Sequence, residues 1–370
     1  MTAYVIRRLL LIVPTLLGIM LLNFVIIQAV PGGPIERVLS TLSGRGDGAT
    51  QRVTGGGGDA PTAGNNEPFN AGAPANSRYR GAQGLDPRFI AQLEKMYGFD
   101  KPAWQRFVLM LGNYVRFDFG ESFFRSAKVT DLIVEKMPVS ISLGIWTTLL
   151  TYLISIPLGI RKAVRDGTRF DVWTSGVIVV GYAIPSFLFA VLLIVLFAGG
   201  SYLQIFPLRG LVSDNFWSLS WPERIVDYLW HMVLPISSLL VGSFATLTLL
   251  TKNSFIEEIN KQYVTTARAK GLDEGQVLYG HVFRNAMLIV IAGFPAAFIS
   301  VLFTGAFLIE IIFSLDGMGL LGYEAALNRD YPVIFGTLFI FTLMGLLLKL
   351  LSDITYMFVD PRIDFEARAA

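Results

Sequence analysis

The run LLLIVPTLLGIMLLNFVIIQAV at residues 9–30 decides the fold class of this chain, because it stays apolar for longer than a helix in a soluble core needs. A helix that crosses the hydrocarbon core of a bilayer needs about 20 predominantly apolar residues. Arg7 and Arg8 precede the run, as they would in a signal peptide, but the run is long for one and ends at Val30 in a poor cleavage site. We therefore expect a retained membrane-spanning helix.

Five more segments of this kind follow, so the sequence predicts six membrane-spanning helices in an all-α polytopic membrane protein. The predicted spans lie at about 9–30, 139–160, 172–198, 230–250, 288–313 and 333–358. The composition agrees, since 53% of the residues are hydrophobic and 16% are charged, whereas a soluble domain carries about 25% charged residues. Prolines inside the first five spans are expected to kink them, although membrane helices also tolerate straight prolines: Pro14, Pro157, Pro185, Pro235 and Pro295.

The basic residues near the spans orient the chain, because cytoplasmic loops of membrane proteins carry an excess of Lys and Arg. With a cytoplasmic N-terminus, the short outer loops receive only Arg209, Arg224 and Arg329. The cytoplasmic side receives many more: Arg7, Arg8, Arg161, Lys162, Arg165, Arg169, Lys252, Lys261, Arg268, Lys270, Arg284, Arg362 and Arg368. Six spans then return the C-terminus to the cytoplasm.

This orientation divides the chain into four parts. They are the N-terminus with the first span at 1–30, a periplasmic segment at 31–138, a core of five spans with the cytoplasmic loop 251–287 at 139–358, and a cytoplasmic tail at 359–370. Within the outer segment, residues 43–84 are rich in Gly, Ala, Asn and Pro and predict a flexible loop. Residues 86–136 show apolar residues at helical spacing, which predicts a helical cap on the outer surface, a docking surface for a delivery protein, or both.

The cytoplasmic loop 251–287 is the most informative stretch outside the spans. Apolar residues recur at helical spacing and predict an amphipathic helix over 256–270, about 22 Å long: Ile256, Ile259, Tyr263 and Ala267. Gly271 is expected to end this helix in the left-handed conformation. Asp273 with Gln276 resembles a capping box that starts the next helix. Small residues near Gly271 favour docking to a partner protein over a helix lying on lipid.

The residues of this loop resemble the coupling loop of type I ABC importer permeases, most closely the peptide and nickel branch. The resemblance implies contact with a partner ATPase for Tyr263, Thr265, Thr266, Ala267, Arg268, Ala269, Lys270 and Gly271. The sequence departs from the Glu-Ala-Ala consensus of that superfamily, because Thr265 and Thr266 occupy the first two places and only Ala267 is kept.

Motifs along the rest of the chain are similar to the same branch, and the long outer segment with Gly159–Lys162 narrows the resemblance to YejB-like permeases. These motifs are Tyr4–Leu10, Pro31–Pro34, Tyr97–Pro102, Phe117–Ser122, Ile309–Phe313 with Gly317–Gly319, and Asp360–Arg362. The resemblance implies the MetI-like permease fold in the bacterial inner membrane. It also implies a second homologous permease subunit, two cytoplasmic ATPase domains and a periplasmic peptide-binding protein as partners. The implied function is uptake of oligopeptides or peptide-like compounds, including peptide antibiotics.

The sequence predicts a transport subunit and not an enzyme. It contains no Gly-x-x-x-x-Gly-Lys-Ser/Thr phosphate loop, so ATP and Mg²⁺ are expected to bind to partner subunits. It has no cysteine, and its two histidines, His231 and His281, lie far apart, so we expect no metal site and no cofactor in this chain. A net charge of +2 gives no basic footprint for nucleic acid.

Ionisable residues inside spans are functional hypotheses, because burying a charge in a membrane is costly. Glu310, near the outer end of the fifth span, is either a pathway or gate residue or a hydrogen-bonded carboxylate at the interface. Lys349 and Asp353 are spaced by four residues and predict a structural ion pair. The alternative functions are a stand-alone secondary transporter or channel and a receptor-type membrane protein. Neither accounts for the coupling-like loop.

Overall fold

The computed structural model describes residues 2–29, 100–199, 202–300 and 307–359 of the 370-residue chain. The predicted flexible loop at 43–84, the first part of the predicted cap and the end of the cytoplasmic tail lie outside these residues. The described residues are helical apart from turns, loops and a single isolated bridge between Glu121 and Lys128. The predicted all-α class is therefore confirmed.

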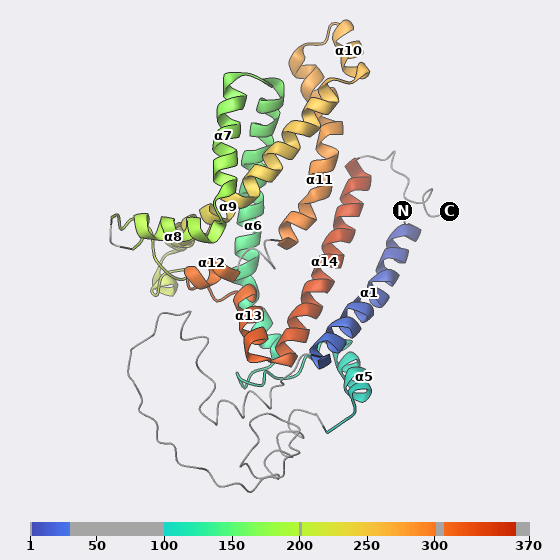
Figure 1. Ribbon diagram of the computed structural model, residues 1–370, viewed down its shortest axis with the longest axis vertical. Coiled ribbons are helices and arrows are strands. Elements are labelled where there is room, and N and C mark those ends of the chain that lie inside the picture. The colour runs from blue at the N-terminus through green and yellow to red at the C-terminus, as the bar shows by residue number, and fades with distance from the viewer. Residues whose placement is uncertain (1, 30–99, 200–201, 301–306, 360–370) are drawn as a thin grey trace. The chain divides into compact units, whose positions relative to one another are not determined.

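The helices follow one another along the chain as Figure 1 shows. Their bounds are α1 Thr2–Ala29, α5 Ala103–Tyr114, α6 Val129–Val164, α7 Arg169–Ala183, α8 Ser186–Phe197, η1 Phe216–Ser218, α9 Trp221–Ile259, α10 Gln262–Ala269, η2 Gln276–Val282, α11 Phe283–Ser300, α12 Phe307–Ile312, α13 Met318–Asn328 and α14 Tyr331–Val359. The chain divides into two compact units. The first comprises Met1–Pro14, Ile133–Leu321 and Ile340–Ala370, and the second comprises Thr15–Leu132 and Gly322–Phe339.

Five helices of the described chain are long and apolar enough to cross a membrane, and a sixth span is formed if the bent pair α7 and α8 counts as one. The kink expected at Pro185 is confirmed, but it divides the third span into two helices, because α7 and α8 meet at 94°. Ile184 is extended (φ −87°, ψ 118°), since the ring of Pro185 disfavours the helical conformation of the residue before it. In contrast, Pro14, Pro157 and Pro235 lie inside continuous helices.

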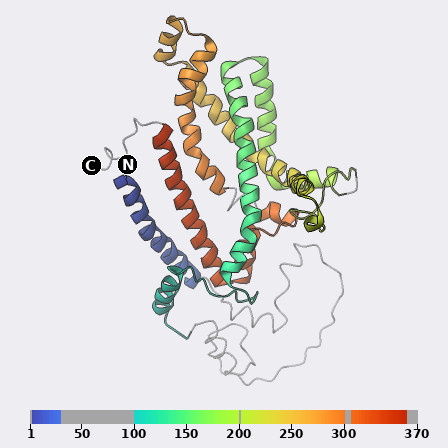
Figure 2. The same ribbon diagram turned by 180° about the vertical axis from the view of Figure 1, so that it is seen from behind.

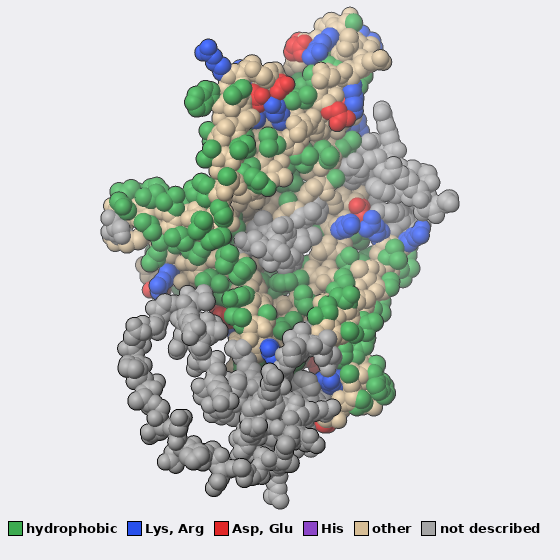
Figure 3. All heavy atoms as spheres, in the orientation of Figure 1, with side chains coloured by type: hydrophobic (Ala, Val, Ile, Leu, Met, Phe, Trp, Pro, Cys, Tyr) green, Lys and Arg blue, Asp and Glu red, His purple; other side chains and the backbone are tan. Residues whose placement is uncertain are grey.

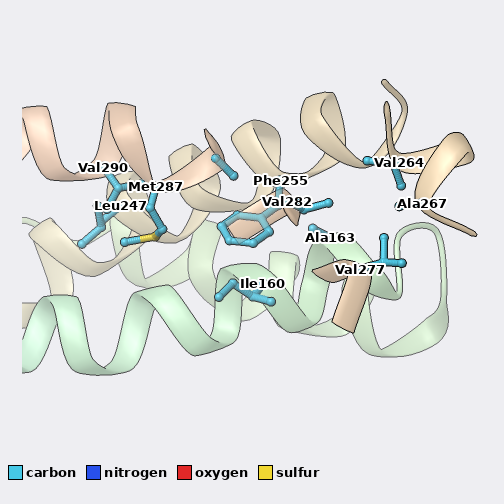
Figure 4. Packing of buried hydrophobic residues seen from close by; sticks show 11 residues of the cluster. Ile160, Ala163, Leu247, Phe255, Val264, Ala267, Val277, Val282, Met287 and Val290 are labelled. Atoms are coloured by element: carbon cyan, nitrogen blue, oxygen red, sulfur yellow. The ribbon is translucent and has the colours of Figure 1, made fainter. Parts of the chain in front are cut away.

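In the first unit, α9 packs against α7, α8 and α11 (Figures 1 and 2), and two apolar clusters form its core. One cluster joins α6, α8, α9 and α12 around Leu143, Met232 and Ile309. The other, the cytoplasmic cluster, lies toward α10 and contains Ile160, Phe255 and the residues drawn in Figure 4. The surface along α7 and α8 is largely hydrophobic, whereas charged side chains gather near α10 and the α6–α7 turn (Figure 3). This pattern is typical of a protein that spans a bilayer.

The second unit contains α5, which confirms a helix within the predicted cap. Tyr114 at the end of α5 packs edge-on against Phe119, with ring centroids 4.8 Å apart. Phe119 and Val129 approach the start of α14 closely at Gly336, where an added Cβ would lie 2.7 Å from Val129 Cγ1. Ser122 donates a hydrogen bond of 2.5 Å to the buried carboxylate of Asp330. Aromatic packing and a buried carboxylate therefore fix the segment after α5.

Candidate coupling site

The cytoplasmic loop forms two helices where the sequence predicted one over 256–270, so that prediction was wrong. α9 ends at Ile259, and α10 begins at Gln262 and is 8 residues long. Between them Lys261 is extended (φ −78°, ψ 150°). The Asn260 side chain donates to the carbonyl of Ile256, 2.9 Å away, at the end of α9. Asparagine favours helix ends because its amide competes with the backbone for hydrogen bonds.

α10 ends as the sequence predicted, with Gly271 in the left-handed conformation (φ +83°). The Leu272 N–H donates to the Ala267 carbonyl (3.4 Å) and the Gly271 N–H to the Arg268 carbonyl (2.9 Å), which is a Schellman motif. Among the residues that the structure describes, none has an atom that would crowd a Cβ on Gly271 within 4 Å. The requirement for glycine therefore comes from the backbone conformation and not from crowding inside this chain.

The capping box after Gly271 is also confirmed. The Gln276 N–H donates to Asp273 Oδ1 (2.6 Å), and the Asp273 N–H donates to Gln276 Oε1 (3.3 Å). This box begins the π-helical turn Gln276–Val282, which continues into α11. A Schellman motif therefore closes the end of α10, and a capping box closes the start of the helix that follows it.

α10 has one face buried in its own chain and one face exposed. Val264 and Ala267 are buried and pack in the cytoplasmic cluster with Ile160, Ala163 and Phe255 (Figure 4). Fully burying an aliphatic or aromatic side chain contributes about 1.5–3 kcal/mol, so this face holds α10 firmly. The exposed face carries the remaining predicted coupling residues on the helix and its last turn: Thr265, Thr266, Arg268, Ala269 and Lys270.

Tyr263 lies between the two faces and is half-buried. Its hydroxyl donates to Glu258 Oε2, 2.7 Å away at the end of α9. Burial and this hydrogen bond raise the pKa of the Tyr263 phenol above its ordinary value, so it stays a neutral donor. Tyr263 therefore joins α10 to α9.

Arg268 and Glu274 form an ion pair across the turn at Gly271. Arg268 Nε lies 2.9 Å from Glu274 Oε1, and Arg268 Nη2 lies 3.0 Å from Glu274 Oε2. Both side chains are exposed, so this bidentate pair adds little stability. The sequence analysis did not anticipate it, although the spacing of six residues across a glycine turn is compatible with such a pair.

Glu310 lies in α12 and is fully buried. Its carboxylate accepts hydrogen bonds from the Ser140 hydroxyl (3.0 Å) and from the Leu320 N–H (2.7 Å). A Cβ on Gly317 would collide with this carboxylate, which explains the glycine. In the described conformation Glu310 is a hydrogen-bonded carboxylate that holds the start of α13. Its role at a pathway or gate stays a prediction.

Asp353 forms a salt bridge with Arg8 of α1, with Nη2 2.9 Å from Oδ2, rather than the predicted pair with Lys349. Lys349 is exposed. Lysine before an acid at a spacing of four residues is the weaker orientation for a helical pair. A partner from a distant helix cannot be found from local spacing. The sequence analysis also missed a group of two lysines and two aspartates that joins the α6–α7 turn to α9 and is largely buried.

The fold and site together define a class: a multi-pass membrane protein with a two-faced cytoplasmic helix between two spans. Residues 155–365 match the family described as "Binding-protein-dependent transport system inner membrane component". The chain belongs to this family. Its fold is that of type I ABC importer permeases, and it is a transport subunit of the bacterial inner membrane, whose partners include ATPases that hydrolyse ATP and a binding protein.

Full-length relatives support this assignment. The chain is 63% identical to the peptidoglycan transport system permease protein YejB of Agrobacterium fabrum (strain C58), over 100% of both chains. It is 59% identical to the inner membrane ABC transporter permease protein YejB of Escherichia coli O157:H7, again over 100% of both. It is 32% identical to the oligopeptide transport system permease protein AppB of Bacillus subtilis (strain 168), over 99% of this chain and 100% of that protein. The similarity to YejB-like permeases is therefore confirmed.

Proposed function

We propose that this chain is the permease subunit through which an ABC importer takes up oligopeptides or peptide-like compounds from the periplasm. Two full-length relatives support this cargo class, since one is named for peptidoglycan transport and another for oligopeptide transport. Peptide-bearing cell-wall fragments and free oligopeptides share a peptide backbone. We therefore expect that backbone to be the common feature of the cargo.

The observation that carries the proposal is the division of α10 into a buried and an exposed face. Val264 and Ala267 fix α10 to α6 and α9 through the cytoplasmic cluster. The exposed face presents short side chains, Thr265, Thr266 and Ala269, together with Arg268 and Lys270. Short side chains allow the close approach of another protein. A partner that moves this face therefore moves the spans with it.

In the proposed complex, a second homologous permease completes the pathway and two cytoplasmic ATPase domains bind ATP and Mg²⁺. One ATPase domain contacts the exposed face of α10, and a periplasmic peptide-binding protein delivers cargo at the outer side. Closure of the ATPases on ATP displaces α10 and switches the pathway between inward-facing and outward-facing states. A stand-alone transporter has no role for such a face.

Reconstitution in vesicles tests the proposal. The chain is reconstituted alone and with its ATPase, second permease and binding protein, and uptake of a labelled tetrapeptide, a disaccharide-tetrapeptide and a disaccharide without peptide is followed. We expect uptake of the two peptide-bearing probes only with all partners and ATP. Uptake by the chain alone without nucleotide contradicts the transport mechanism. Uptake of the plain disaccharide at the same rate contradicts the peptide-directed cargo.

A further inference from the structure

Lys162, in the last turn of α6, is a fully buried lysine whose ammonium group is completely surrounded by polar atoms. Its Nζ donates to the Asp171 carbonyl (2.9 Å), to Thr174 Oγ1 (2.8 Å) and to Ser175 Oγ (2.7 Å). Asp171 Oδ1 also lies 2.9 Å from this nitrogen. An ammonium group has three protons, so each has a partner on the first two turns of α7. The end of α6 is therefore fixed to α7 by a charge that no water reaches.

Asp171 extends this contact to α9. Its Oδ2 accepts hydrogen bonds from Lys252 Nζ of α9 (2.7 Å) and from the Gly167 N–H in the α6–α7 turn (3.2 Å). Lys252 Nζ also lies 2.8 Å from Asp166 Oδ1 in the same turn. We name Lys162, Asp166, Asp171 and Lys252 the ionic brace. Two positive and two negative charges join α6, α7 and α9 with no net charge.

The ionic brace lies beside the place where α6 and α9 touch most closely. A Cβ on Gly159 would lie 2.6 Å from Thr251 Cβ and 2.9 Å from the Thr248 carbonyl oxygen, so no side chain separates the two helices. Thr251 is the neighbour of Lys252 along α9. On the cytoplasmic side, Phe255, one turn beyond, packs in the cluster that holds α10. The contacts that hold α10 and the contacts that hold α7 are therefore adjacent on α9.

A buried set of charges is a poor way to gain stability alone, because apolar residues of similar size would hold the helices as well. Charge pairs have a narrow range of distances and therefore fix one arrangement. We propose that the ionic brace is a positioning network that makes α7 move together with α10. This inference rests on the proposed function for its purpose. It assigns Lys162, Asp171 and Lys252 to coupling although they lie in α6, α7 and α9 and not in α10.

The first test uses Lys252→Met, which removes the contact between α9 and Asp171. Asp171 still contacts Lys162 and Gly167 in this variant. In the complete complex we expect normal insertion and ATP hydrolysis near the wild-type rate, but about tenfold less cargo taken up per ATP, within the range for a coupling network. Lys252→Arg keeps the positive charge, so it should restore most of the wild-type ratio of cargo taken up to ATP hydrolysed. Lys349→Met is the matched control, because Lys349 is an exposed lysine outside the ionic brace. An unchanged ratio in Lys252→Met overturns the proposal.

Asp166→Asn gives a milder test, because the Asp166 side chain is half exposed and its loss does not threaten folding. We expect a smaller fall in the same ratio. If Lys252→Met fails to insert, this variant decides the question: a wild-type ratio overturns the proposal. Wild-type vesicles without ATP-dependent uptake would instead contradict the proposed function, so the two failures are distinct.

The second test needs neither cargo nor partners. The sequence contains no cysteine, so spin labels can be placed at Val177 of α7 and Ala269 of α10, both exposed. In the full chain in nanodiscs we expect a narrow distribution of the distance between the labels. Lys252→Met should broaden it, and Lys349→Met should not. Equal widths in wild type and Lys252→Met overturn the positioning role.

Discussion

Two buried carboxylates of the first unit, Asp171 near the cytoplasmic end and Glu310 near the outer end, are held in different ways. Asp171 contacts the ammonium groups of Lys162 and Lys252 at 2.9 and 2.7 Å. Among the described residues, no lysine or arginine forms a salt bridge with Glu310, which accepts hydrogen bonds from Ser140 and Leu320 instead. Asp171 is therefore held by full charges and Glu310 by dipoles.

The difference follows from what each carboxylate joins. Asp171 joins α6, α7 and α9 close to α10, the helix that we propose contacts a partner ATPase. Glu310 closes the start of α13 after the turn that follows α12, and the first N–H groups of a helix are a natural partner for an anion. Asp171 therefore fixes three helices relative to one another, whereas Glu310 fixes the start of one.

Asp171→Ala should have the largest effect. It leaves Lys162 buried and without its carboxylate, and breaking a buried ion pair from one side costs about 3–5 kcal/mol. We expect a sharp fall in the thermal unfolding midpoint of the purified chain and little inserted protein. Glu257→Ala is the control, since its carboxylate and its partner Lys261 are both exposed. A loss in Asp171→Ala no larger than in Glu257→Ala would show that the charges do not fix this end.

Glu310→Ala should cost less, about 1–3 kcal/mol, because it leaves a hydroxyl and backbone N–H groups without an acceptor but no unpaired charge. Glu310→Gln keeps one acceptor oxygen and should recover part of that loss. Glu324→Ala is the control, because the Glu324 side chain in α13 is partly exposed. The thermal unfolding midpoints of the three variants test whether their losses of stability follow this order, from Glu310→Ala to Glu310→Gln to Glu324→Ala. If Glu310→Gln is as damaging as Glu310→Ala, the charge itself matters and the comparison with Asp171 fails.

Gly271→Val should insert normally but uncouple ATP hydrolysis from uptake, because valine is strained at φ +83° by about 1–2 kcal/mol. We expect about tenfold less uptake per ATP, which corresponds to about 1.4 kcal/mol of coupling. Gly271→Asn is the matched control, since asparagine tolerates the left-handed conformation. Equal uptake in the valine and asparagine variants would show that the end of α10 does not take part in coupling ATP hydrolysis to uptake.

Arg268→Gln and Glu274→Gln should have the smallest effects on stability. Both break the same exposed bidentate pair, whose contribution is below about 1 kcal/mol. We expect the two unfolding midpoints to fall by the same small amount. A large fall in the unfolding midpoint of either variant would mean that the stability of α10 depends on this exposed charge pair. The stability of the α6–α7 turn depends on the ionic brace in the same way.

Features that depend on neighbouring residues were predictable from the sequence. The spans followed from apolar length, and Gly271 and the box of Asp273 and Gln276 followed from local hydrogen-bonding patterns. The kink at Pro185 was predicted but not its size, and the turn at Asn260 was missed, because a long apolar or amphipathic pattern continues across both. The pattern reports which face is apolar, but it does not report where the helix axis turns.

Contacts between distant helices were not predictable. Asp353 pairs with Arg8, 345 residues earlier, and Lys162 was counted only as one of many cytoplasmic basic residues. A lysine at the inner end of a span is usually solvated, so nothing in its spacing distinguishes the one that is buried. Which face of α10 is exposed was likewise open, because Ala267 and Ala269 are chemically identical and only the fold buries one of them.

The central claim is that a partner ATPase contacts the exposed face of α10, and these two alanines test it most directly. Single substitutions Ala269→Cys and Ala267→Cys are introduced into the cysteine-free chain, and each complex is treated with a short photoactivatable thiol reagent. We predict that Ala269→Cys crosslinks to the ATPase subunit and that Ala267→Cys, buried in the cytoplasmic cluster, does not. Crosslinking of neither variant, or of Ala267→Cys alone, would contradict the account.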